Sequence, residues 1–128
     1  MAKILIVDDE ELLRKAVYDH LKNNGFTVFE AANGKEGLAV AFRQHPDLIL
    51  LDVIMPVMDG EEMMGELKKD RWGKDVPIIF LTNVSDPIKL AEISKETKSQ
   101  AEKFDYLIKS DWKLEEVTDK INKRLRKN

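Results

Sequence analysis

Five residues that could carry chemistry each stand at the end of a short apolar run. They are a pair of carboxylates near the start of the chain, a third carboxylate, a hydroxyl and an ammonium: Asp8, Asp9, Asp52, Thr82 and Lys109. Three carboxylates at one place repel one another, but a divalent cation together with one ammonium would balance their charge. Oxygen ligands in a chain without cysteine favour Mg2+.

Asp52 could act as a nucleophile in such a site. A carboxylate can accept a phosphoryl group to form an acyl phosphate, and Mg2+, Lys109 and Thr82 would stabilise the charge on the transferred oxygens. The same residues also have structural explanations, because acids from Asp8 to Glu11 could cap a helix and a lone Asp or Thr often forms a turn. Complementary groups after four different apolar runs favour the functional interpretation.

The elements that must position these residues alternate along the chain. Strands are predicted for five short apolar runs, at 3–7, 26–30, 47–51, 77–81 and 105–108. Four of these runs are continuously apolar, which is typical of strands covered on both faces, whereas the second alternates more. Apolar positions at helical spacing predict helices over 10–23, 34–44, 60–69 and 113–127. This order predicts a doubly wound α/β sheet, whose binding crevice lies beyond the carboxyl ends of the strands.

Composition narrows the class of protein. A length of 128 residues suits one domain, and a net charge of -3 argues against broad binding to nucleic acid. The basic segment KRLRK near the C-terminus is interpreted as a solvated helix end. No apolar run is long enough to cross a bilayer, so we expect a cytoplasmic protein without membrane insertion.

The sequence resembles the receiver domain of two-component response regulators, through IVDDE, LLDVIMPVMDG, FLTN and YLIK. The resemblance covers essentially the whole chain. It implies a flavodoxin-like fold, with a five-stranded parallel sheet of order 2-1-3-4-5 and five helices. Residues 1–128 would then form one receiver domain with no output domain, which either works alone or belongs to a longer protein.

The resemblance also implies roles for individual residues. Asp52 would be the phosphoacceptor, and Lys109 would bind the phosphoryl group. Asp9 would bind Mg2+ directly, Asp8 would hold a metal-bound water, and the backbone carbonyl of Ile54 would be a further ligand. The expected cofactor is therefore Mg2+.

Other positions are expected to respond to phosphorylation or to modulate it. Thr82 would move toward the phosphoryl group and Tyr106 would follow it inward, in a two-state shift. Ile54 and Val84 would flank the path of the attacking water. Because neither can orient water, we predict slow self-dephosphorylation. Asn83 is larger than the usual residue after the switch threonine and could restrict the phosphodonor or hydrogen-bond to the phosphate.

Two further departures from the family pattern concern the last third of the chain. Ser110 replaces the proline that usually follows the lysine, and the segment between Thr82 and Lys109 is longer than usual, which predicts a lengthened fourth helix. In the loop after the phosphoacceptor, Pro56 is expected to fix a turn and Gly60 to give backbone freedom.

The resulting hypothesis is a phosphorylation-controlled switch rather than a turnover enzyme. Its partners would be a histidine kinase or phosphotransfer protein, and a downstream protein that binds the face formed by the fourth helix, fifth strand and fifth helix. One alternative is a degenerate receiver-like module that binds partners without phosphorylation. A weaker alternative is an aspartyl-nucleophile phosphatase, but such enzymes carry the nucleophile on the first strand in a DxD motif, whereas residues 8–10 read DDE.

Overall fold

A computed structural model describes residues 1–82, 104–108 and 113–126. Within these ranges the chain forms five strands, four α-helices and one short 3-10 helix. In chain order they are β1 (Lys3–Val7), α1 (Glu11–Asn23), β2 (Thr27–Ala31), α2 (Gly34–Gln44), β3 (Leu48–Asp52), α3 (Gly60–Lys68), η1 (Gly73–Asp75), β4 (Ile78–Thr82), β5 (Phe104–Ile108) and α5 (Leu114–Arg126). The predicted fourth helix would lie in 83–103, outside the described residues.

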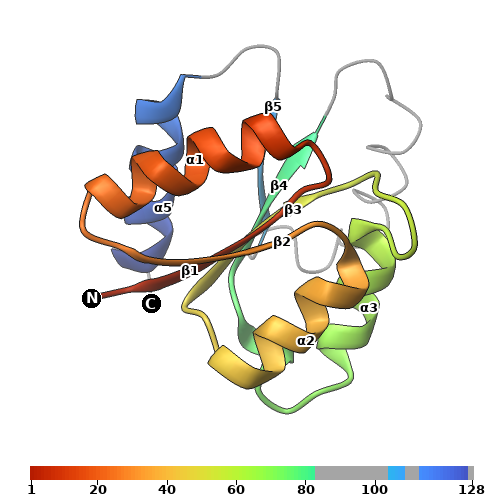
Figure 1. Cartoon of the computed structure of the whole chain (residues 1–128). Coiled ribbons are helices and arrows are strands. Elements are labelled where there is room, and N and C mark those ends of the chain that lie inside the picture. The colour runs from red at the N-terminus through yellow and green to blue at the C-terminus, as the bar shows by residue number, and fades with distance from the viewer. Residues whose placement is uncertain (83–103, 109–112, 127–128) are drawn as a thin grey trace.

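The strands form one parallel sheet of order β2-β1-β3-β4-β5 (Figure 1). This is the predicted doubly wound topology. The register aligns the carboxyl ends of neighbouring strands, because Val7 pairs with Leu51 and Asp52 pairs with Leu81. Residues at these ends therefore share one edge of the sheet.

Two hydrophobic cores lie on opposite faces of the sheet. Helices α2 and α3 cover one face, where Leu51 and Phe80 pack against Met63. Helices α1 and α5 cover the other face, where Leu50 packs with Val17. Figure 1 shows the two helix pairs on the two sides of the sheet. All five residues of β3 are buried, which explains why its sequence is continuously apolar up to the aspartate.

Helix ends follow local sequence signals. α1 ends before Asn24 and Gly25, and Gly25 has a φ of 93°, a value that glycine adopts without strain. α3 begins with a capping box, in which the Asp59 side chain accepts from the Glu62 backbone N–H and the Glu62 side chain accepts from the Asp59 N–H. None of the helices in the described ranges is long and apolar enough to cross a membrane.

Where the structure describes the predicted elements, their bounds differ from the prediction by at most one residue. The second, third and fourth strands each begin and end one residue later than predicted. For β3 and β4 the reason is that Asp52 and Thr82 still pair with neighbouring strands, with Leu81 and Ile108 respectively. These two residues are thus the last residues of their strands rather than the first residues after them.

Candidate functional site

Asp8 follows β1 and is held through both its backbone and its side chain. Its N–H donates to the Ala31 carbonyl at 3.0 Å, which extends the pairing with β2 by one residue. Its carboxylate Oδ1 accepts from the Glu10 N–H at 2.9 Å, and its carbonyl accepts from Arg14 Nη1 at 2.8 Å. The side chain of Asp8 is fully buried. The turn between β1 and α1 is therefore fixed around one carboxylate.

Helix capping by the first acids was the structural alternative, and it explains only part of this turn. Glu10 is the N-cap of α1 but makes no side-chain cap hydrogen bond, and Glu11 lies in the first turn. Asp8 bonds to the N–H of the N-cap residue rather than to the N–H groups of the first helical turn. Asp9 is exposed and makes no side-chain hydrogen bond to any residue that the structure describes.

Asp52 ends β3, and its exposed fraction is only 5%. Behind it, the N–H of Val53 donates to the Leu81 carbonyl, and the N–H of Gly60 donates to the Val53 carbonyl at 2.9 Å. Gly60 lies so close to β3 that an added Cβ would stand 2.3 Å from the Asp52 carbonyl oxygen. The first residue of α3 therefore packs directly on the backbone of the candidate phosphoacceptor.

Gly60 was expected to give this loop backbone freedom. In the structure the positive φ of 70° in the loop falls on Val57, whereas Gly60 allows close packing of α3 against β3. Val57 is the central residue of a turn in which the Met58 N–H donates to the Pro56 carbonyl at 2.8 Å. This is a γ-turn of the rarer, strained type, and it is unusual for a β-branched residue.

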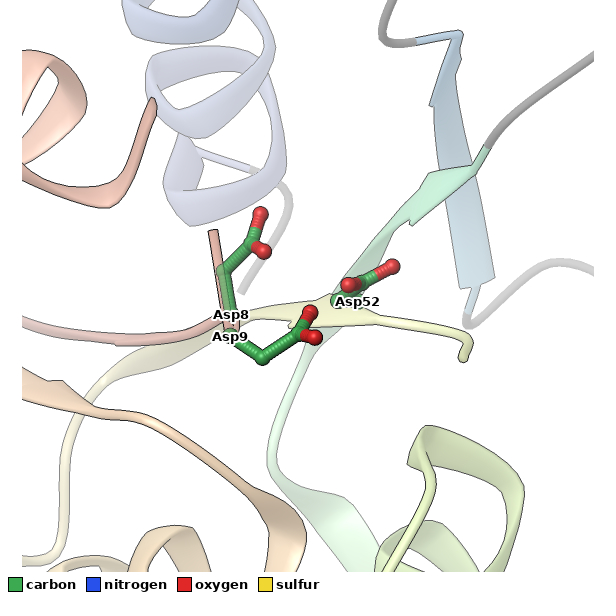
Figure 2. A group of neighbouring side chains, drawn as sticks. All are labelled: Asp8, Asp9 and Asp52. Atoms are coloured by element: carbon green, nitrogen blue, oxygen red, sulfur yellow. The ribbon is translucent and has the colours of Figure 1, made fainter. Parts of the chain in front are cut away.

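The three aspartates form one cluster at the carboxyl edge of the sheet. One carboxylate oxygen from each of Asp8, Asp9 and Asp52 lies within 4.8 Å of the other two. Figure 2 shows the three side chains next to one another at the ends of β1 and β3. Asp8 and Asp52 are both buried, so at up to 4.8 Å their repulsion is on the order of 3 kcal/mol at an effective dielectric constant of about 20. The cluster therefore favours a bound cation.

The donor set fits Mg2+. Mg2+ binds oxygen at about 2.0–2.1 Å in an octahedron, so two ligands on opposite vertices lie roughly 4.2 Å apart. The observed spacing of up to 4.8 Å slightly exceeds this limit. With this spacing, two of the carboxylates could bind Mg2+ directly and the third through a bound water. All three could bind it directly after a small closing movement of the side chains.

The remaining predicted site residues are only partly placed. Thr82 ends β4 opposite Ile108, the last residue of β5, and the backbone of Tyr106 lies within β5 opposite Phe80. Ile54 follows β3, and its side chain is 51% exposed. Lys109 lies outside the described residues. So do Asn83 and Val84, which were expected to modulate phosphorylation, and Ser110, which departs from the family pattern.

One feature of the site was not predicted. Arg14, in the second turn of α1, donates to the Asp8 carbonyl and also forms an ion pair with Glu30 on β2, at 2.8 Å from its Nε. The pair joins residues 16 positions apart, and no local pattern in the sequence connects them.

The fold and the cluster together define a doubly wound α/β protein with a candidate cation site at its strand ends. A family model described as the response regulator receiver domain matches residues 4–122 of the chain. The chain therefore belongs to the response regulator receiver domain family. Receiver domains act in two-component signalling, and they are typically phosphoacceptors rather than turnover enzymes.

Individual proteins show the same relationship. The chain is 44% identical over 84 residues to the probable transcriptional regulator ycf27 of Porphyridium aerugineum. The matched segment covers 66% of the chain and 34% of the relative. The chain thus spans about a third of the length of the first curated relatives it matches.

Among solved structures, the chain is similar to chemotaxis protein CheY4 of Vibrio cholerae, with a TM-score of 0.82, 33% identity and coverage of 96% of the chain and 98% of that protein. It is also similar to the receiver domain of sensor histidine kinase PA1611 from Pseudomonas aeruginosa PAO1. That match has a TM-score of 0.81 and 30% identity and covers 97% of both chains. The PA1611 structure has a magnesium ion coordinated in its active site cleft.

Proposed function

We propose that this protein is a phosphorylation-controlled signalling switch, in which Asp52 accepts a phosphoryl group from a histidine kinase or phosphotransfer protein. The observation that carries the proposal is the cluster of three carboxylates within 4.8 Å at the carboxyl edge of the sheet, two of them buried. Three carboxylates this close, two of them buried, repel one another, and a bound cation would offset that repulsion.

In the proposed reaction, a carboxylate oxygen of Asp52 attacks the phosphorus atom of the donor. The new P–O bond forms as the bond from phosphorus to the donor's leaving atom breaks, and the leaving group departs with that electron pair. Asp9, Asp52 and the Ile54 carbonyl would hold Mg2+ directly and Asp8 through water. When bound, Mg2+ supplies charge neutralisation to the transferred oxygens. Lys109 and Thr82 are proposed to bind the same oxygens.

Phosphorylation would change the surface that partners bind. We propose that Thr82 and Tyr106 respond to the phosphoryl group, so that the face including β5 and α5 gains or loses affinity for a downstream protein. A bound group can shift such an equilibrium only if it interacts differently with the two states. The phosphoryl group can do so because it adds negative charge to that of the Asp52 carboxylate.

A protein phosphodonor is supported by the surface around the cluster. Three of the large apolar side chains that are exposed in the described part of the chain lie on the two segments that carry the aspartates: Leu12 at 88%, Ile54 at 51% and Val57 at 75%. Donor and acceptor atoms must meet at Asp52, so a protein donor would cover these residues. Burying them would contribute to its binding.

The test is intact-mass analysis after incubation with acetyl phosphate and Mg2+. The unmodified chain is compared with D52N, and with D47N as the matched control, because Asp47 lies just before the opposite end of the same strand and binds the Lys3 N–H. The proposal expects one phosphoryl adduct in the unmodified chain and in D47N, which requires Mg2+, and none in D52N. An unmodified chain that takes up no phosphoryl group and does not bind beryllofluoride would support the degenerate binding module instead.

The phosphorylated state is expected to be long-lived. Ile54 is apolar and half-exposed beside the phosphoacceptor, so it cannot orient or activate the attacking water. Replacing it by glutamine, which can hydrogen-bond to water, should change the rate of phosphate loss without changing Mg2+ binding. A lifetime of only seconds for the unmodified chain in Mg2+ would contradict this expectation.

A further inference from the structure

Arg14 is placed to control the geometry of the carboxylate cluster without touching its side chains. Its side chain is 14% exposed, and its guanidinium makes two directed contacts: Nη1 to the Asp8 carbonyl and Nε to Glu30 Oε1, both at 2.8 Å. The two contacts join three elements, because Arg14 lies on α1, Asp8 follows β1 and Glu30 lies on β2. A planar guanidinium with several fixed donors suits this kind of connection.

The carbonyl that Arg14 holds belongs to the peptide that links Asp8 to Asp9. The Asp8 N–H donates to the Ala31 carbonyl, and Asp8 Oδ1 accepts from the Glu10 N–H. The Arg14 contact fixes the Asp8 carbonyl as well. Asp9 is exposed and has no side-chain hydrogen bond within the described residues. The direction in which Asp9 leaves the backbone is thus set by a peptide that Arg14 orients.

We infer that Arg14, held by Glu30, is a positioning residue for the Mg2+ site, acting through the Asp8–Asp9 peptide. The inference rests on the proposed function, because it concerns the same carboxylates. Residues behind metal ligands often matter this way, and their loss typically lowers metal affinity about 10–100-fold.

Charge and geometry predict opposite signs for the loss of Arg14, which makes the inference testable. Removing a positive charge near three carboxylates should strengthen the binding of a cation if only charge mattered. Removing a positioning contact should weaken it. The Arg14–Glu30 pair borders a polar hollow of about 280 Å3, so a shorter or apolar side chain can be accommodated there without a clash.

The experiment is calorimetric titration of Mg2+ alone into the unmodified chain, R14M, R14K and K15M. Lys15 is the matched control, because it is the next residue of α1, is exposed, lines the same hollow, and K15M also removes one positive charge. Thermal unfolding of each variant in EDTA first shows that it is folded at the titration temperature.

We expect R14M and R14K to bind Mg2+ at least about 10-fold more weakly than the unmodified chain, and K15M to bind it no more weakly. R14K should also bind Mg2+ more weakly, because a lysine ammonium keeps the charge but cannot make both hydrogen bonds, to the Asp8 carbonyl and to Glu30. Unchanged or tighter binding by R14M would overturn the inference and leave the proposed function intact. An unmodified chain that does not bind Mg2+ would overturn both.

Discussion

The contact between Gly60 and the Asp52 backbone predicts that G60A destabilises the protein. An added Cβ would lie 2.3 Å from the Asp52 carbonyl oxygen and 3.2 Å from the Val53 Cα, whereas ordinary contact begins at 3.4 Å. The first turn of α3 and the end of β3 must therefore separate by about 1 Å. Both sides of this contact are backbone, and overpacking of this kind costs about 1–3 kcal/mol. The better helix propensity of alanine offsets less than about 1 kcal/mol of this loss in the free energy of unfolding, because Gly60 is the first helical residue.

The assay is urea denaturation of the unmodified chain, G60A and G65A. Gly65 is the matched control, because it lies on the same helix, is exposed and has nothing within 4 Å of an added Cβ. We expect G65A to gain about 0.5–1 kcal/mol in the free energy of unfolding and G60A to lose roughly 1–2 kcal/mol. G60A should also accept phosphate more slowly, because the displaced backbone carries Asp52. A G60A variant as stable as G65A would refute the close-packing argument.

Three further predictions concern the same region. V57G should raise the free energy of unfolding by roughly 0.5–1 kcal/mol, because relief of the left-handed φ exceeds the extra chain entropy of glycine, and an unchanged or lower denaturation midpoint would contradict this. D59A should lower it by about 1 kcal/mol through loss of the α3 capping box, measured in the same way. D52N should unfold at a higher temperature than the unmodified chain in EDTA, because carboxylate repulsion is relieved, and Mg2+ should stabilise D52N less. Equal melting temperatures in EDTA would argue against that repulsion.

The fold could be predicted because its signals are local. The continuous apolar run of β3 predicts a strand buried on both faces, and all its residues are buried. Asn24 and Gly25 mark the end of α1 because the chain needs a positive φ there. The aspartates of the cluster could be predicted as well, because parallel strands bring their carboxyl ends to one edge.

Other features could not be predicted because their causes are not local. The Arg14–Glu30 pair depends on how α1 and β2 pack, and charged residues on a helix and an edge strand are common without pairing. The positive φ of Val57 has no signal in the sequence, since a β-branched residue disfavours it. The tertiary structure imposes that conformation, with the Met58 carbonyl accepting from the Gly34 N–H at 2.9 Å.

The exposure of Ile54 has a consequence for how such a protein can change over evolutionary time. The side chain is 51% exposed and belongs to neither hydrophobic core, and surface substitutions of this kind usually change stability by less than about 0.5 kcal/mol. The same position lies two residues after Asp52, the last residue of β3. Under the proposed function, Ile54 affects how long the phosphoryl group stays on Asp52, while the stability of the fold depends on other residues. Selection could then adjust the timing of the response without endangering the folded state.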